Sequence, residues 1–106
     1  NRKRSIEIMS PADGTQVTEF VQVNGAVSIA PFENNLSYFI YDEAGNQLGI
    51  GPVTVTAPDF GAPGTFSELI PLAEIPADTT VFLEIQDISA ADGSLFALDT
   101  VKLIVK

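Results

Sequence analysis

The sequence predicts an all-β fold made of short antiparallel strands. Stretches in which apolar and polar residues alternate recur about every ten residues, and Pro, Gly, Asp and Asn separate them, as is typical of strands joined by turns. No amphipathic stretch of useful length has the period of a helix. In a chain of 106 residues, this pattern indicates an immunoglobulin-like β-sandwich of about seven antiparallel strands in two sheets.

The first two expected strands cover residues 6–8 and 21–29. In both, apolar residues alternate with polar ones, and Pro11 and Pro31 follow them. Gly25 lies inside the second strand, where a glycine suggests a β-bulge or a close approach of another backbone. Residues 12–15 are expected to form a turn.

The strand at residues 36–42 is expected to be central, because both of its faces are apolar. One face carries Leu36, Tyr38 and Ile40, and the other carries Ser37, Phe39 and Tyr41. A tight polar turn at residues 42–46 leads into a return strand at 47–50. Gly49, Gly51 and Pro52 make this return irregular, which suits an edge strand protected against aggregation.

The second half ends in the clearest hairpin. Alternation resumes at residues 53–56, a long loop covers 57–64, and a strand follows at 66–72. Two strands at 81–86 and 100–105 flank a turn at 90–94. The inward positions of all these strands give the expected core: Ile6, Ile8, Val21, Val23, Tyr38, Ile40, Phe66, Ile70, Leu83, Ile85, Val101 and Leu103.

The composition bounds the chemistry. The chain has no Cys, His or Trp, which excludes disulfides, Cys/His zinc sites and Ser-His or Cys-His catalysis. We expect one domain over residues 6–106, with 1–5 as a linker or the cut edge of a longer chain. The chain begins at Asn1 and contains no signal peptide, so we expect any targeting signal to lie outside this fragment.

Charge is distributed very unevenly along the chain. All five basic residues lie at or before Arg4 or at and after Lys102, whereas the 14 acidic residues lie between, giving a net charge of −9. Such a surface repels phosphate, so we expect binding neither to nucleic acid nor to anionic membranes. No apolar run is long enough to insert into a membrane. Solubility is the simplest role for this charge, and cationic partners are the alternative.

Several short motifs recur here in the order and spacing of a known family. They are Ser10-Pro11 with Gly14, the 21–25 strand with Gly25-Ala26, Phe32-Glu33, Asp42 with Gly45 and Leu48, Gly64 with Phe66, Leu83-Glu84-Ile85, Ser89 and Asp92-Gly93-Ser94. In these positions the chain resembles the immunoglobulin-like domain of bacterial sporulation and germination proteins. The resemblance covers nearly the whole chain from Ile6 to Val105.

That resemblance implies a location and a role. Domains of this family often accompany a GerMN domain in secreted or lipid-anchored envelope proteins, and they are thought to act in extracellular interaction or adhesion. It brings no catalytic residues to carry over. We therefore expect an extracellular or cell-envelope location.

Three aromatic residues form the candidate interface. Phe39 and Tyr41 on the central strand, beside Phe82 on its neighbour, can form an exposed apolar patch. The alternative is that a loop or the chain's own edge covers them. The partner would be another protein or a neighbouring domain, and weak self-association is also open.

Acidic residues have simpler interpretations. Asp87, Asp92 and Asp99 around the last hairpin, and Asp42 with Glu43, lack the spacing of a calcium loop, so turn formation explains them better than ion binding. Glu33 is expected to cap backbone N–H groups. Glu68 falls on the buried face, so either its strand bulges or that face is half covered. Asp59-Phe60-Gly61 matches a kinase motif by chance.

These observations predict a non-catalytic extracellular module without cofactors. It would mediate protein–protein interaction or adhesion, or space a neighbouring domain. The alternative function is a carbohydrate-binding module, for which only Phe39, Tyr41, Phe60 and Phe82 could supply aromatic platforms. A pure spacer that binds nothing is the third alternative.

Overall fold

The computed structural model describes residues 4–59, 61–89 and 91–106. Over these residues the chain forms eight strands and one short 3₁₀ turn, η1 (Phe32–Asn34). The strands are β1 (Ile6–Ser10), β2 (Thr15–Val17), β3 (Phe20–Val27), β4 (Asn35–Asp42), β5 (Gln47–Thr56), β6 (Gly64–Pro71), β7 (Thr79–Ile88) and β8 (Leu95–Val105). The all-β prediction is confirmed.

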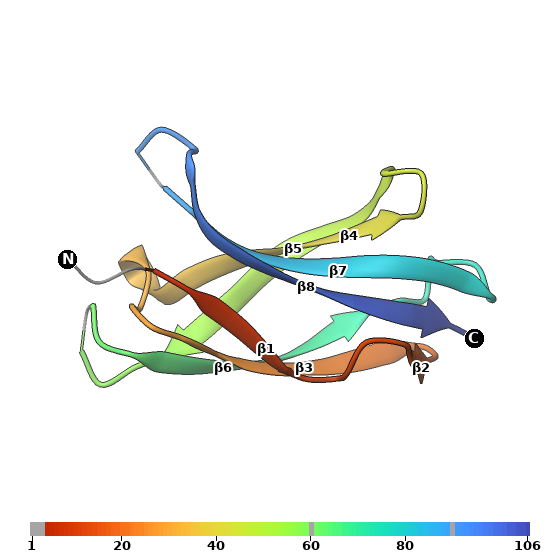
Figure 1. Cartoon of the computed structure of the whole chain (residues 1–106), viewed down its shortest axis with the longest axis horizontal. Helices are drawn as coiled ribbons and strands as arrows, with labels where there is room; N and C mark the ends of the chain where they lie inside the picture. The colour runs from red at the N-terminus through yellow and green to blue at the C-terminus, as the bar shows by residue number, and fades with distance from the viewer. Residues whose placement is uncertain (1–3, 60, 90) are drawn as a thin grey trace.

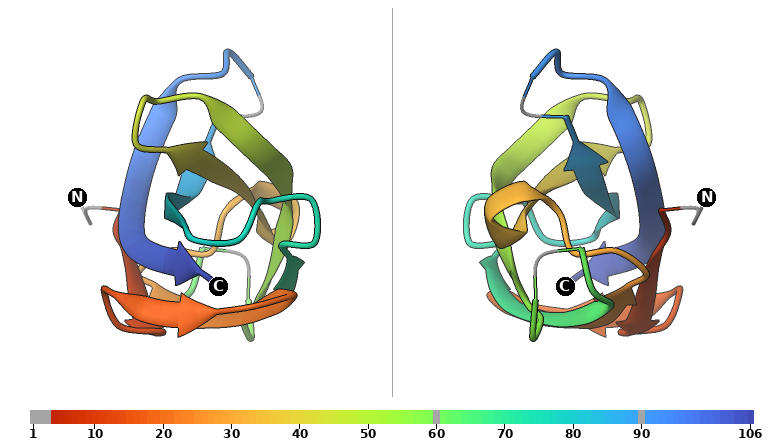
Figure 2. Two further views of the ribbon diagram at one scale, coloured as in Figure 1. Left: turned by 90° about the vertical axis from the view of Figure 1, so that its right-hand side faces the viewer. Right: turned by 90° about the vertical axis from the view of Figure 1, so that its left-hand side faces the viewer.

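The strands belong to one strongly curled sheet, in the order β1-β3-β6-β5-β4-β7-β8-β2. The curl places β4, β7 and β8 across from β1, β3 and β6 (Figure 1). Strand β5 runs along one side of the molecule between these two layers (Figure 2). Residues 47–54 of β5 face β4, and Val55 and Thr56 pair with β6. The expected separation into two sheets is therefore not seen, because the ten-residue β5 joins both halves.

The sheet is mixed, whereas the sequence predicted antiparallel strands only. Strand β2 pairs in parallel with the end of β8, with Thr15 opposite Leu103 and Val17 opposite Val105. No sequence pattern indicated this strand, since β2 has only three residues and follows a turn directly. The pairing covers the outer edge of β8.

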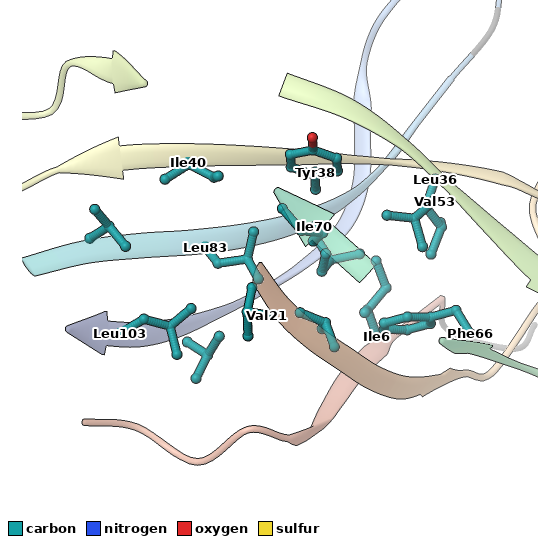
Figure 3. Close-up of a cluster of buried hydrophobic side chains, with 14 of the residues drawn as sticks. Ile6, Val21, Leu36, Tyr38, Ile40, Val53, Phe66, Ile70, Leu83 and Leu103 are labelled. Carbon is teal, nitrogen blue, oxygen red and sulfur yellow. The ribbon is translucent and has the colours of Figure 1, made fainter. Parts of the chain in front are cut away.

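The core lies between the two layers (Figure 3). Every residue predicted for it is buried, except that Ile8 is half-buried and packs against the cluster. The list of expected core residues omitted Leu36, although Leu36 had been placed on the inward face of its strand, where it is 3% exposed. It also omitted other buried residues in strands and connections: Val27, Ala30, Val53, Val55, Leu72, Ile75, Val81 and Val105.

At Gly25 the structure shows the close approach that the sequence suggested, whereas the neighbouring β-bulge lies in β1, at Met9. The pairing of β1 with β3 shifts register between Ile8 and Ser10, opposite Gly25 and Asn24, which marks a β-bulge. A side chain at Gly25 would overlap the Phe66 ring and the Glu7 carbonyl oxygen. The absence of a side chain at Gly25 therefore lets a core aromatic ring pack directly on the backbone of β3.

The strand register decides between the two explanations offered for Glu68, a bulge or a half-covered face. Strand β6 pairs with β3 from Phe20–Pro71 to Val27–Gly64 without any irregularity, so no bulge turns Glu68 outward. Its side chain lies on the inward face between Phe66 and Ile70 and is half-buried. The inward face of β6 is thus only partly covered at this position.

Both predicted hairpin turns form as the sequence indicated. Asp42 accepts hydrogen bonds at Oδ1 from the backbone N–H groups of Ala44 and Asn46, at 2.9 and 2.8 Å, and Gly45 adopts φ +88°. In the last hairpin, Ser94 N–H donates to Asp92 Oδ1 at 3.0 Å and Gly93 adopts φ +76°. Ala90 of that turn lies outside the described residues.

Candidate interaction surface

The alternation of β4 sends Phe39 and Tyr41 to the outer face of the sheet. Leu36, Tyr38 and Ile40 are buried, whereas Phe39 and Tyr41 are half-buried. Their rings are nearly parallel, at an interplanar angle of 10°, and their centroids lie 6.1 Å apart. The two side chains therefore form one contiguous aromatic unit on the outside.

Phe82 joins them from the neighbouring strand. It lies directly opposite Tyr41 in the β4–β7 pairing and is also half-buried. The structure thus brings together all three residues that the sequence selected. We call Phe39, Tyr41, Phe82 and Ile50 the outer aromatic face.

Ile50 is the member that the sequence missed. It lies opposite Phe39 in the β4–β5 pairing, and 60% of it is exposed. Sequence periodicity could not place it there, because the side of the sheet reached by Ile50 depends on the register set by the bulge near Leu48. Leu48 is 38% exposed beside it.

Acidic and polar residues border this face. Glu84, on β7, lies between Phe39 of β4 and Thr100 of β8 and is paired with both. Its carboxylate accepts a hydrogen bond from Gln86 Nε2 at 2.6 Å and one from Thr100 Oγ1 at 3.4 Å. Lys102, opposite Phe82, is the basic neighbour. The face is therefore apolar at its centre and polar at its border, as interfaces commonly are.

The carboxylates considered for an ion site each have a separate structural contact. Asp87 is 4% exposed, and its Oδ2 accepts a hydrogen bond from Arg4 Nη1 at 3.0 Å. Asp99 Oδ2 accepts a hydrogen bond from the Ile8 N–H at 2.8 Å. Among residues 4–59, 61–89 and 91–106, no three acidic side chains come together in a group able to hold a metal ion.

Two turn carboxylates have lowered pKa values. The side-chain hydrogen bond from Asn46 is the main cause that lowers the pKa of Asp42, and backbone N–H donors add to it. The backbone N–H and hydroxyl of Ser94 lower the pKa of Asp92. Both groups stabilise turns, which agrees with the structural interpretation of these acids.

Glu33 does not cap the start of β4 as predicted. It has a left-handed backbone conformation (φ +57°), its side chain is exposed, and its carboxylate accepts no hydrogen bond from the described part of the chain. The turn is closed instead by the Asn34 N–H, which donates to the Pro31 carbonyl at 2.9 Å. Phe60, one of the aromatic residues considered for sugar binding, lies outside the described residues.

The strand order defines the class of protein. The orders β1-β3-β6-β5 and β4-β7-β8 reproduce the ABED and CFG arrangement of immunoglobulin domains, with β5 joining the two. This order makes the protein an immunoglobulin-like all-β domain. In the described residues no helix is long and apolar enough to span a membrane.

The sequence comparison then gives the family. The profile of the immunoglobulin-like domain of bacterial spore germination matches residues 5–94, and the chain belongs to this family. The match ends just before β8, although β8 pairs with β7 along almost its whole length. No curated protein sequence matches this chain significantly.

Proposed function

We propose that this domain is a non-catalytic module of an exported or envelope protein that binds another protein through the outer aromatic face. The observation that carries the proposal is the grouping of Phe39, Tyr41 and Phe82, extended by the 60% exposed Ile50. Contiguous apolar side chains on the outside of a sheet are typical of interaction sites, and aromatic residues supply much of the binding energy there. The exported location is part of this proposal, and the family description itself names only bacterial spore germination.

Charge narrows the kind of partner. Glu84 borders the face beside Phe39 and Lys102 borders it beside Phe82, but between Ser5 and Val101 the chain has acidic residues and no basic one. A partner with basic groups at the border of its own surface would be attracted, and an acidic one repelled. The proposal therefore takes the partner to be a neutral or basic protein surface.

A carbohydrate ligand is the second candidate. The observation in its favour is the nearly parallel pair of rings of Phe39 and Tyr41, which could stack against a sugar. The pure spacer is the third candidate, and it would leave these rings without a ligand. These candidates differ in what the face binds, so the same variants separate them.

The test compares three forms of the isolated domain as bait for envelope proteins of a spore-forming bacterium. They are the unchanged domain, the double variant Phe39→Ser/Tyr41→Ser, and the matched control Phe20→Ser, which removes an aromatic side chain that is 52% exposed on β3. The proposal expects one partner retained by the domain and by Phe20→Ser but lost by the double variant. Sedimentation velocity on the same three forms tests self-association.

Two results would count against the proposal. Equal retention of the partner by the double variant would show that the outer aromatic face is not the contact surface. Binding to a glycan array that the double variant alone loses would move the assignment to the carbohydrate-binding alternative.

A further inference from the structure

The curled sheet has an open seam between β5 and β6. These two strands pair only at Val55–Phe66 and Thr56–Thr65. Beyond that point no described strand pairs with residues 47–54 of β5 on the side away from β4, or with 67–71 of β6 on the side away from β3. Two strand edges therefore diverge from one junction.

Two prolines indicate which backbone groups face the seam. Pro52 and Pro71 have no N–H to donate, so each fits its strand with the nitrogen turned away from its paired neighbour. Backbone groups alternate sides along a strand, so Ile50 and Leu69 present N–H and C=O groups to the same opening. The pairing of Thr65 with Thr56 is consistent with this alternation.

An apolar groove lies beside the open edge of β5. Tyr38 and Ile40 of β4, Leu48 and Ile50 of β5, and Leu72 and Ile75 of the following connection line it. The connection is held in place, because the Leu72 N–H donates to the Glu19 carbonyl at 2.8 Å and the Ile75 N–H donates to the Leu72 carbonyl at 3.0 Å. The groove therefore exists before any partner arrives.

The charge around this opening is entirely acidic. Glu74 lines the groove and is exposed, and Glu68 lies half-buried on the inward face of β6. No basic residue occurs between Ser5 and Val101 to neutralise them. A segment that enters the seam would gain from carrying Lys or Arg at this end.

We propose that the seam receives an extended segment of a partner protein, one that alternates apolar residues with Lys or Arg. Its backbone pairs with β5 around Ile50, its apolar side chains enter the groove beside Tyr38 and Leu72, and its basic groups lie near Glu68 and Glu74. This is strand addition to a sheet edge. It rests on the proposed function in taking the ligand to be a protein, but apart from Ile50 it uses residues outside the outer aromatic face.

A second copy of this chain fits the seam poorly. Each copy carries a net charge of −9, so two acidic edges would repel each other. Pro52 and Pro71 also remove a donor from each edge, which hinders pairing along its full length. A short basic segment avoids both problems.

The test selects ligands from a phage-displayed library of random linear peptides, with the unchanged domain as the target. We expect the enriched peptides to alternate apolar and basic residues. In NMR titrations a selected peptide should shift the amide signals of Ile50 and Leu69. Replacing its Lys and Arg by Glu should weaken binding by roughly tenfold or more. Two further peptides carry N-methyl groups on alternate backbone amides, one on the odd and one on the even positions. The peptide whose methylated amides would otherwise donate to β5 should not bind.

Four outcomes would overturn the proposal: no enrichment, an acidic consensus, full binding by both N-methylated forms, or signal shifts confined to Phe39, Tyr41 and Phe82. The last outcome would leave the proposed function standing, since the peptide would then occupy the outer aromatic face. Conversely, peptides that bind at the seam of the Phe39→Ser/Tyr41→Ser variant would support strand addition even if that face binds nothing.

Discussion

Gly25 and Gly51 each lie opposite an aromatic residue on the neighbouring strand, and the ring covers the glycine. Gly25 faces Phe66 and Gly51 faces Tyr38. A side chain at Gly25 would meet both the Phe66 ring and the Glu7 backbone, whereas the three atoms nearest to one at Gly51 all belong to the Tyr38 side chain. At the scale of single residues, the two aromatic rings can therefore pack where they do because positions 25 and 51 are glycines.

Gly25→Ala should destabilise the domain more than Gly51→Ala does. Backbone cannot move aside as easily as a ring beside the partly unpaired strand β5, so we expect a loss of about 2–3 kcal/mol at Gly25 and less at Gly51. Urea unfolding of the two variants measures both losses. Equal losses, or a larger one at Gly51, would contradict this account of the packing.

Asn46→Ala should raise the pKa of Asp42 toward its ordinary value. Asn46 donates from its side chain to Asp42 Oδ2 at 3.0 Å, and this bond is the main cause of the lowered pKa. A lowered folded pKa stabilises the fold above the unfolded pKa, and this contribution is lost as pH falls through the lowered value. NMR titration measures the change, with Asp92 as the internal control; an unchanged pKa of Asp42 would be inconsistent with this assignment.

At the scale of elements, Arg4 joins the start of the chain to the last hairpin. Its guanidinium bonds to Asp87 on β7 and lies 4.7 Å from the ring centroid of Phe96 on β8. Asp87 has a side-chain exposure of 5% and Arg4 one of 34%. The boundary predicted at residues 1–5 stays untested, yet Arg4 already contacts the domain.

Arg4→Met should destabilise the domain by about 2–3 kcal/mol, since it leaves the Asp87 carboxylate nearly buried without its partner. Adding Asp87→Asn removes that charge and should restore part of the loss. Chemical denaturation of the single and double variants measures both effects. If Arg4→Met unfolds like the unchanged domain, Arg4 belongs to the linker after all.

Strands whose own residues alternate between apolar and polar could be predicted from the sequence. Strands whose extent or facing is set by pairing with a distant strand could not. The alternation around Tyr38 and Leu83 located β4, β7 and their inward faces correctly. Strand β5 was expected to break near Gly51 and Pro52, but pairing with β4 carries it through both. Phe39, Tyr41 and Phe82 were found by the same alternation, whereas Ile50 and the seam required the register.

At the scale of the whole molecule, the chain carries a net charge of −9 and has no basic residue between Ser5 and Val101. Mutual repulsion among the acidic side chains opposes compaction. Arg4 and Lys106 form the ion pairs seen in the described residues, and the second, between Lys106 and Asp78 at 3.5 Å, is exposed. Little of the acidic charge is therefore neutralised within the chain.

Salt should accordingly stabilise the fold. Raising the ionic strength from low to physiological values screens the repulsion, and we expect a gain of about 1 kcal/mol in the free energy of unfolding. Thermal or urea unfolding in sodium chloride measures it, with sodium sulfate avoided because it also strengthens apolar burial. A loss of stability with added salt would mean that the two ion pairs outweigh the repulsion.

The central claim is that the outer aromatic face contacts a protein partner, and photo-crosslinking tests it most directly. A photoreactive phenylalanine analogue replaces Phe39 in one protein and Phe20, on β3 in the opposite layer, in another. Within the intact envelope protein, we predict that illumination crosslinks the partner to position 39 and not to position 20. Crosslinking at both positions alike, or at position 20 alone, would contradict the account.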